Sequence, residues 1–198
     1  MIRFFNGIFD CIQKKKAYFI MLLIASIIAI VLGVITAINF GGGVFAIDLD
    51  NIGYIKFLKG NCGLMSMIFN LVLSLSVFFI AILLCNSKRF LIPLALVFYL
   101  YLIYSQVVVF ISIILIYGFL NCVILVVLLF VYNIVIWTAF LLIVLELSCI
   151  NNGYDYFKKC FKIKECKLLL YLLLVLLAIV VFSVVLTLLK SYVVLLIY

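Results

Sequence analysis

Uncharged polar side chains recur inside the most apolar stretches of this chain, and they are the residues that could bind something there. Three of them, Ser66, Asn70 and Ser74, follow one another at intervals of four residues, which places them on one face of a helix. Amides and hydroxyls in apolar surroundings either hydrogen-bond to neighbouring helices or line a cavity for a solute. The sequence therefore predicts a polar stripe with one of these two roles, made of Ser66, Asn70, Ser74, Ser105, Gln106 and Asn133.

The residues that catalysis and metal binding usually require do not form a pattern. The chain has no His, so it contains no Ser-His or Cys-His pair. Its seven Cys include no C-x-x-C pair of the kind that binds zinc. No pair of acidic residues lies within the apolar stretches. We therefore expect no enzyme activity, no metal and no cofactor.

The apolar stretches themselves are long enough to cross a lipid bilayer. Residues 90–145 contain no Lys, Arg, Asp or Glu, and as helix such a stretch would cross a hydrocarbon layer of about 30 Å twice. In lipid the backbone polar groups must be satisfied within the segment, which requires helices. The sequence predicts a single all-α domain over residues 1–198, a polytopic membrane helix bundle with five transmembrane helices at about residues 17–38, 63–85, 90–116, 122–146 and 168–190.

The positive charges alternate between connectors and predict the orientation. The segment before the first span, the connector at residues 86–89 and the connector at residues 148–167 are rich in Lys and Arg, whereas residues 41–60 have no net charge and residues 117–121 have no charge. The positive-inside rule then places the N-terminus inside and the C-terminus outside. We expect a multi-pass protein of a cell membrane, the cytoplasmic membrane of a bacterium. The net charge of +8 is explained by contact with lipid headgroups, not with nucleic acid.

Three segments outside the spans favour short helices at the membrane surface. Residues 1–13 carry Ile2, Phe5 and Phe9 at helical spacing, and a frayed terminus is the alternative. Residues 41–60 begin with three Gly and predict a flexible turn before a short interfacial helix. The connector before the last span predicts a basic amphipathic helix on the inner leaflet, which either docks a partner or anionic lipid or simply flanks the span; its basic residues are Lys158, Lys159, Lys162 and Lys164.

Small residues recur every fourth position along the first span. Ridges of this kind let two helix backbones approach closely. We expect the ridge to hold the first span inside the bundle, and the alternative is that it joins a second copy of the chain or another protein. The ridge consists of Ala25, Ala29, Gly33 and Ala37.

Several short elements resemble the stage II sporulation protein M family. These are Val31-Leu32-Gly33-Val34-Ile35, Tyr117-Gly118-Phe119-Leu120, the polar Asn133 in mid-helix, and the basic residues 156–167. The family usually has a Pro beside that mid-helix polar residue, and this chain does not. The resemblance implies a non-enzymatic membrane scaffold, since family members in spore-forming bacteria anchor and position cell-wall hydrolases during engulfment.

Two functions are therefore expected, in order of preference. The first is a scaffold or assembly subunit, which uses the ridge for helix association and residues 41–60 for another membrane or extracytoplasmic protein. The alternative is a small permease or the substrate-binding membrane subunit of a multicomponent transporter, in which the polar stripe lines a pathway. A closed core would favour the first function and a pocket in mid-membrane the second.

Overall fold

The computed structural model describes residues 16–40, 52–85, 92–148 and 167–197, and no strand occurs among them. One helix is short, α3 (Gly53–Leu58). Five are long: α2 (Lys16–Phe40), α4 (Leu64–Cys85), α5 (Ile92–Tyr117), α6 (Phe119–Ser148) and α8 (Lys167–Ile197). The predicted all-α architecture is confirmed for this part of the chain.

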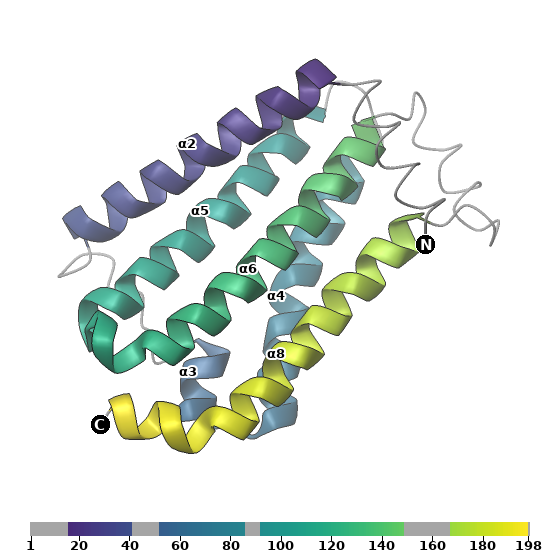
Figure 1. Ribbon diagram of the computed structural model, residues 1–198. Coiled ribbons are helices and arrows are strands. Elements are labelled where there is room, and N and C mark those ends of the chain that lie inside the picture. The colour runs from purple at the N-terminus through teal and green to yellow at the C-terminus, as the bar shows by residue number, and fades with distance from the viewer. Residues whose placement is uncertain (1–15, 41–51, 86–91, 149–166, 198) are drawn as a thin grey trace.

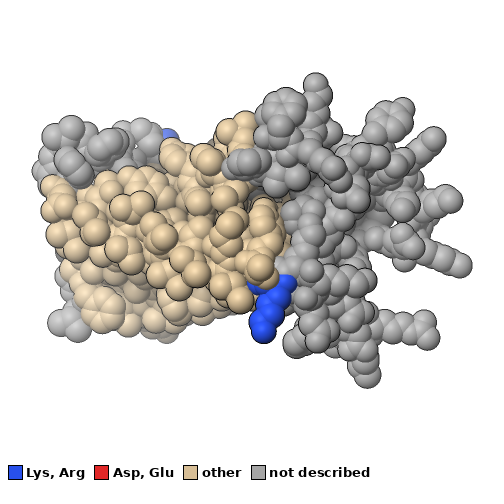
Figure 2. All heavy atoms as spheres, turned by 90° about the horizontal axis from the view of Figure 1, so that it is seen from above, with Lys and Arg blue, Asp and Glu red and all other residues tan. Residues whose placement is uncertain are grey.

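All five long helices are long and apolar enough to span a membrane, which confirms the predicted number of spans. Large apolar side chains cover their outer surface, and Figure 2 shows a face on which the described atoms are nearly free of charge. The protein is therefore a multi-pass membrane protein. Helix α6, the fourth predicted span, begins at Phe119, earlier than predicted. Helix α8 continues to Ile197, because no Gly or Pro after residue 190 stops an apolar helix from continuing.

Four of the long helices form a closed ring. Helix α4 packs on α5, α5 on α6, α6 on α8, and α8 again on α4, whereas α2 lies outside this ring against α5. Successive long helices run in opposite directions (Figure 1). One end of the bundle therefore holds the beginning of α2, and we call it the Lys16 end. The other holds the turn between α5 and α6, and we call it the Gly118 end.

The turn between α5 and α6 consists of a single residue. Gly118 has φ +77°, a conformation that residues with a side chain rarely adopt, and its N–H donates to the carbonyl of Ile114 at 3.0 Å. The Cys122 N–H then donates back to the Gly118 carbonyl at 3.3 Å, at the start of α6. So short a connection forces α5 and α6 to be antiparallel neighbours.

Helix α2 lies against α5 through the predicted ridge. Ala29, Gly33 and Ala37 are buried and Ala25 is half-buried. A hydrogen bond adds to this contact: the Ser26 hydroxyl donates to the Leu22 carbonyl at 2.7 Å, so its oxygen is left to accept from the Tyr99 hydroxyl at 3.2 Å. The structure thus places the ridge inside the molecule, facing α5.

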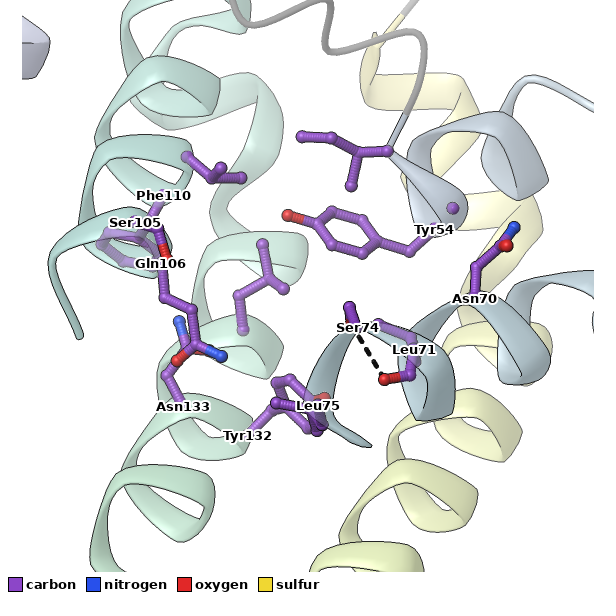
Figure 3. Close-up of a pocket in the computed structure, with 14 residues that line it drawn as sticks. Tyr54, Asn70, Leu71, Ser74, Leu75, Ser105, Gln106, Phe110, Tyr132 and Asn133 are labelled. Atoms are coloured by element: carbon purple, nitrogen blue, oxygen red, sulfur yellow. Dashed lines mark hydrogen bonds between the residues drawn. The ribbon is translucent and has the colours of Figure 1, made fainter. Parts of the chain in front are cut away.

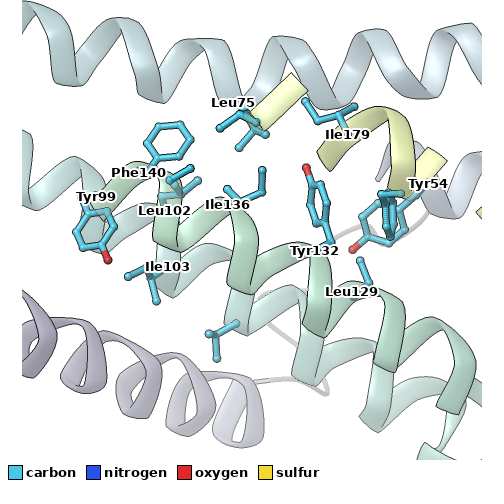
Figure 4. Close-up of a cluster of buried hydrophobic side chains, with 14 of the residues drawn as sticks. Tyr54, Leu75, Tyr99, Leu102, Ile103, Leu129, Tyr132, Ile136, Phe140 and Ile179 are labelled. Atoms are coloured by element: carbon cyan, nitrogen blue, oxygen red, sulfur yellow. The ribbon is translucent and has the colours of Figure 1, made fainter. Parts of the chain in front are cut away.

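The apolar core follows the seams of the ring. Leu102 of α5, Ile136 and Phe140 of α6 and Ile179 of α8 are buried there (Figure 4). Among the described residues, the buried polar side chains are Ser112, Asn133 and Ser183. Ser183 is satisfied within its own helix, because its hydroxyl donates to the Ile179 carbonyl at 2.7 Å. Asn133 is the starting point for the site described below.

Helix α3 is packed into the Gly118 end of the bundle. It contacts α4 and α8, and four of its six residues are buried: Tyr54, Ile55, Phe57 and Leu58. The Lys190 ammonium of α8 lies 4.5 Å from the centre of the Phe57 ring, a cation–π contact that ties α3 to α8. A helix is therefore present within the connector where one was expected, with most of its surface covered by protein.

Several expected elements lie outside the described residues. They are the N-terminal helix at residues 1–13, the glycine-rich start of the connector at residues 41–51, and the basic helix with Lys158, Lys159, Lys162 and Lys164.

Candidate solute-binding cavity

A cavity of about 370 Å³ lies between α3, α4, α5 and α6 (Figure 3). This volume falls within the range of small-molecule sites, about 300–1,000 Å³. The polar side chains that line the cavity are Asn70, Ser74, Ser105, Gln106 and Asn133. The structure thus brings five of the six residues of the predicted polar stripe to one place, from three different helices.

The sixth residue of the stripe, Ser66, does not line the cavity. It lies in the first turn of α4 and is exposed. Asn70 begins the polar wall one turn later, where it packs against the backbone of α3: a Cβ atom on Gly53 would stand 3.2 Å from the Asn70 Cβ. Position 53 therefore suits a glycine, because α3 approaches α4 closely here.

The two serines contribute acceptors to the cavity. The Ser74 hydroxyl donates to the Leu71 carbonyl at 2.9 Å, and the Ser105 hydroxyl donates to the Leu102 carbonyl at 3.0 Å. Each hydroxyl hydrogen is thus used within its own helix, and the oxygen lone pairs remain free to accept.

The two amides contribute donors. The Gln106 carbonyl oxygen accepts a hydrogen bond from the indole N–H of Trp137, which leaves the NH₂ group of Gln106 for the cavity. The Asn133 side chain is only 6% exposed, and it makes no hydrogen bond to any of the residues that the structure describes. The Asn133 amide atoms are not fully buried and line the cavity, where they remain open to water or a solute, which makes Asn133 the most informative residue of the site.

Two tyrosines line the cavity, Tyr54 of α3 and Tyr132 of α6. The Tyr132 ring lies 4.6 Å from that of Phe182, and the Tyr54 ring meets the edge of the same Phe182 at 6.1 Å. Phe182 of α8 therefore holds both tyrosines in place from behind. Figure 3 shows Tyr54 extending from α3 across the cavity. Burial, and to a smaller extent the neighbouring Tyr132, raises the pKa of Tyr54, so its hydroxyl keeps its proton at neutral pH and can donate.

The cavity suits a neutral molecule. Its described lining contains donors, acceptors and apolar surface, and no Lys, Arg, Asp, Glu or His. A charged ligand would lose its hydration there without gaining a counter-ion. The described residues also contain no group of three His, Cys, Asp or Glu side chains that could hold a metal ion. The arrangement of the described residues supports binding of a neutral solute.

The hydrogen bond from Trp137 to Gln106 provides a fluorescence signal, because Trp137 is the only Trp of the chain. We expect Gln106→Leu to move its emission to shorter wavelength, since the indole N–H loses its polar partner. The emission spectrum of the purified protein measures this. Ser112→Ala is the control, because Ser112 is also on α5 but lines neither this cavity nor the surroundings of Trp137. Equal spectra for Gln106→Leu and the unmodified protein would contradict the contact.

Sequence reasoning missed the aromatic residues of the site. Tyr132 precedes Asn133 directly, so its place near the polar stripe could have been suspected. Tyr54 gave no such signal, because it lies in a connector that the sequence assigned to the membrane surface. Only the packing of α3 between α4 and α8 brings it to the cavity.

The chain matches no known protein family, and no curated protein or solved structure is significantly similar to it. The resemblance to the stage II sporulation protein M family therefore stays a prediction.

Proposed function

We propose that this protein is a non-enzymatic membrane subunit that binds a small neutral solute, the substrate-binding part of a transporter or a small permease. One observation carries the proposal: polar residues from α4, α5 and α6 converge on one cavity in which Asn133 has no described protein partner. If these residues only held helices together, their side chains would bond to each other across the helix contacts. Gln106 alone makes such a bond, with Trp137 of α6, whereas the two serines bond to their own helices and Asn133 bonds to no described residue.

The depth of the cavity supports transport across the membrane. Ser74, Gln106 and Asn133 each lie near the middle of their helices. Solute sites of membrane transporters are typically found at this depth. Tyr54 reaches the cavity from α3, which belongs to the Gly118 end. A solute bound beside Asn133 is therefore covered from that end by α3.

We further propose that the Lys16 end faces the cytoplasm and the Gly118 end faces outwards. The support is the charge distribution: all Lys and Arg residues belong to the Lys16 end or to segments attached to it, except Lys56, Lys59 and Lys190. In this orientation α3 covers the cavity from the outside. The cavity itself is then the binding site of an importer or an exporter, in a bacterial cytoplasmic membrane.

The scaffold role keeps less support. Two surfaces were expected to contact partners: the small-residue ridge of α2 and the connector that contains α3. The ridge faces α5, and most of α3 is buried. Neither the ridge nor α3 is free to bind another protein without first leaving the bundle, and residues 41–51 of the connector lie outside the described part of the chain. A transport role still requires a partner, because nothing in the described cavity couples solute movement to an energy source.

Two serines of α4 provide a matched test of a water-accessible cavity. Ser74 and Ser76 each donate to the carbonyl three residues earlier, at 2.9 Å and 2.8 Å, but only Ser74 lines the cavity. In a variant without the native Cys, we expect Ser74→Cys to react with a water-soluble methanethiosulfonate about tenfold faster than Ser76→Cys, because the thiolate forms only in water.

Solutes can then be screened by protection of the same thiol. Neutral planar amides, nucleobases and nucleosides offer the donors, acceptors and apolar surface that the cavity matches. A bound solute is expected to slow labelling of Ser74→Cys and to leave Ser76→Cys unchanged. Equal labelling of the two variants would show that the cavity is closed to water, which would contradict the proposal.

A further inference from the structure

We propose that a groove on the outside of the ring binds an acyl chain of an anionic phospholipid. The groove has a volume of about 450 Å³ and lies between α2, α5 and α6. We call it the lipid groove. Its apolar lining includes Leu23, Ile30, Tyr99, Ile103, Ile134 and Trp137.

The packing of α2 explains why the groove exists. Helices α2 and α6 both pack closely on α5, but they make few contacts with each other. Helix α5 therefore forms the floor and the other two form the sides (Figure 1). Tyr99 and Ile103, the floor residues, are each 1% exposed, whereas Leu23 and Ile134 at the rims are exposed. In a membrane protein such a groove opens to the hydrocarbon layer.

The polar groups in the lipid groove are already bonded within the protein. The Tyr99 hydroxyl bonds to Ser26, whose own hydrogen goes to the Leu22 carbonyl. The Trp137 N–H donates to Gln106, and the Thr138 hydroxyl donates to the Ile134 carbonyl at 2.7 Å. The groove therefore presents no unpaired donor to an occupant. A hydrocarbon chain fits it, and a polar solute would gain no hydrogen-bond donor there.

The position of the lipid groove selects the headgroup. Its lining comes from the first half and the middle of α2, the first half of α5 and the second half of α6, so most of it lies towards the Lys16 end. Lys16 is exposed at that end, and most other Lys and Arg residues of the sequence belong to segments attached to it. A phospholipid whose acyl chain enters the groove from this side has its headgroup at the basic Lys16 end. The positive charge there favours an anionic headgroup.

The headgroup also decides how selective the groove can be. Lipid tails are as apolar as Leu side chains, so exchanging one lipid for another gains little inside the groove. Attraction of an anionic headgroup by one nearby Lys favours it about fivefold over a zwitterionic lipid with the same tails. We therefore expect the groove to prefer the anionic lipid over the zwitterionic one, and we expect salt to weaken this preference.

Trp137 makes the test site-specific, because it is the only Trp of the chain and lies in the lipid groove. The full chain is reconstituted in phosphatidylcholine vesicles that contain increasing fractions of phospholipid with brominated tails, which quench Trp fluorescence on contact. We expect half-maximal quenching at about fivefold lower mole fraction for brominated phosphatidylglycerol than for brominated phosphatidylcholine. Raising the salt concentration should reduce this difference.

Two variants of α2 separate the lipid groove from the general lipid surface. Ile30→Phe places a larger side chain in the groove and should weaken quenching by both lipids. Ile27→Phe is the matched control, because Ile27 is 61% exposed and does not line the groove. Circular dichroism and size-exclusion chromatography show whether both variants fold.

Three results would overturn the proposal. Equal quenching by the two headgroups would indicate ordinary surrounding lipid. Equal quenching of Ile30→Phe and Ile27→Phe would show that the bromines reach Trp137 by another route. An absence of quenching would show that the groove is covered, and a dimer on size exclusion would then identify a second copy of the chain as the cover.

Discussion

Replacing Asn133 with Leu is expected to lower the affinity for the solute of the cavity about 10- to 100-fold and, at the same time, to make the protein more stable. Leu has nearly the shape of Asn without its amide. Each neutral hydrogen bond contributes about 0.5–1.5 kcal/mol, and an amide can make two of them with one solute, so the loss corresponds to that range of affinity. Asn133 is the buried amide to which the structure gives no described protein partner.

The gain in stability has the same cause. Without solute, the amide of Asn133 has lost much of its access to water and gained no bond to the described part of the protein. Leu removes this penalty, so the free energy of unfolding should rise by about 1 kcal/mol. A residue that serves solute binding and not folding is expected to show this combination.

Both quantities can be measured on the purified protein. Affinity is followed by the emission of Trp137, which reports on the cavity through Gln106, with the solute that protects Ser74→Cys best. Stability is measured by unfolding in mixed micelles. Ser76→Ala is the control and should leave the affinity unchanged, since Ser76 lies outside the cavity. Unchanged affinity together with lower stability for Asn133→Leu would show instead that Asn133 holds helices together.

The spans could be predicted from the sequence because hydropathy and length decide them almost alone. All five were found, and errors were confined to their ends, where apolar residues continue into the connectors. The helical face of Ser66, Asn70 and Ser74 could also be predicted, because spacing within one helix is independent of the other helices. Whether that face meets the polar faces of α5 and α6 depends on how each helix is rotated in the bundle, and a single sequence contains no signal for that rotation.

The place of α3 could not be predicted for a different reason. Six residues are too few for a span, and Lys56 and Lys59 indicate water or headgroups nearby. The helix nevertheless buries Tyr54 and Phe57 while Lys190 rests on the Phe57 ring. Long side chains with a charged tip can cover apolar surface in this way, which hides a buried helix behind a charged sequence.

The ridge of small residues predicts the largest effect on stability. At Gly33 an added Cβ atom would lie 2.9 Å from Val107 Cγ1 and 3.2 Å from the Tyr104 carbonyl oxygen. Both distances are shorter than comfortable contacts, so α2 and α5 must separate or shift. Overpacking of this kind costs about 1–3 kcal/mol, whereas Ala gains about 1 kcal/mol over Gly as a helix former. The difference leaves a net loss, and we expect Gly33→Ala to lower the free energy of unfolding by up to about 2 kcal/mol.

A second substitution identifies the contact as the cause. Val107→Ala removes the Cγ1 atom that the new Cβ would meet at 2.9 Å but keeps the Val107 Cβ, which lies at 3.0 Å. In that background Gly33→Ala should therefore cost less, with a coupling energy of at least about 0.5 kcal/mol in a double-mutant cycle. Gly63→Ala is the matched control, because a Cβ atom there has no described neighbour within 4 Å. Its effect should stay within about 0.5 kcal/mol. If Gly33→Ala instead raises the free energy of unfolding, as helix propensity alone would, then α2 does not rest on α5 through this ridge, and the ridge becomes available to a second copy of the chain or another protein.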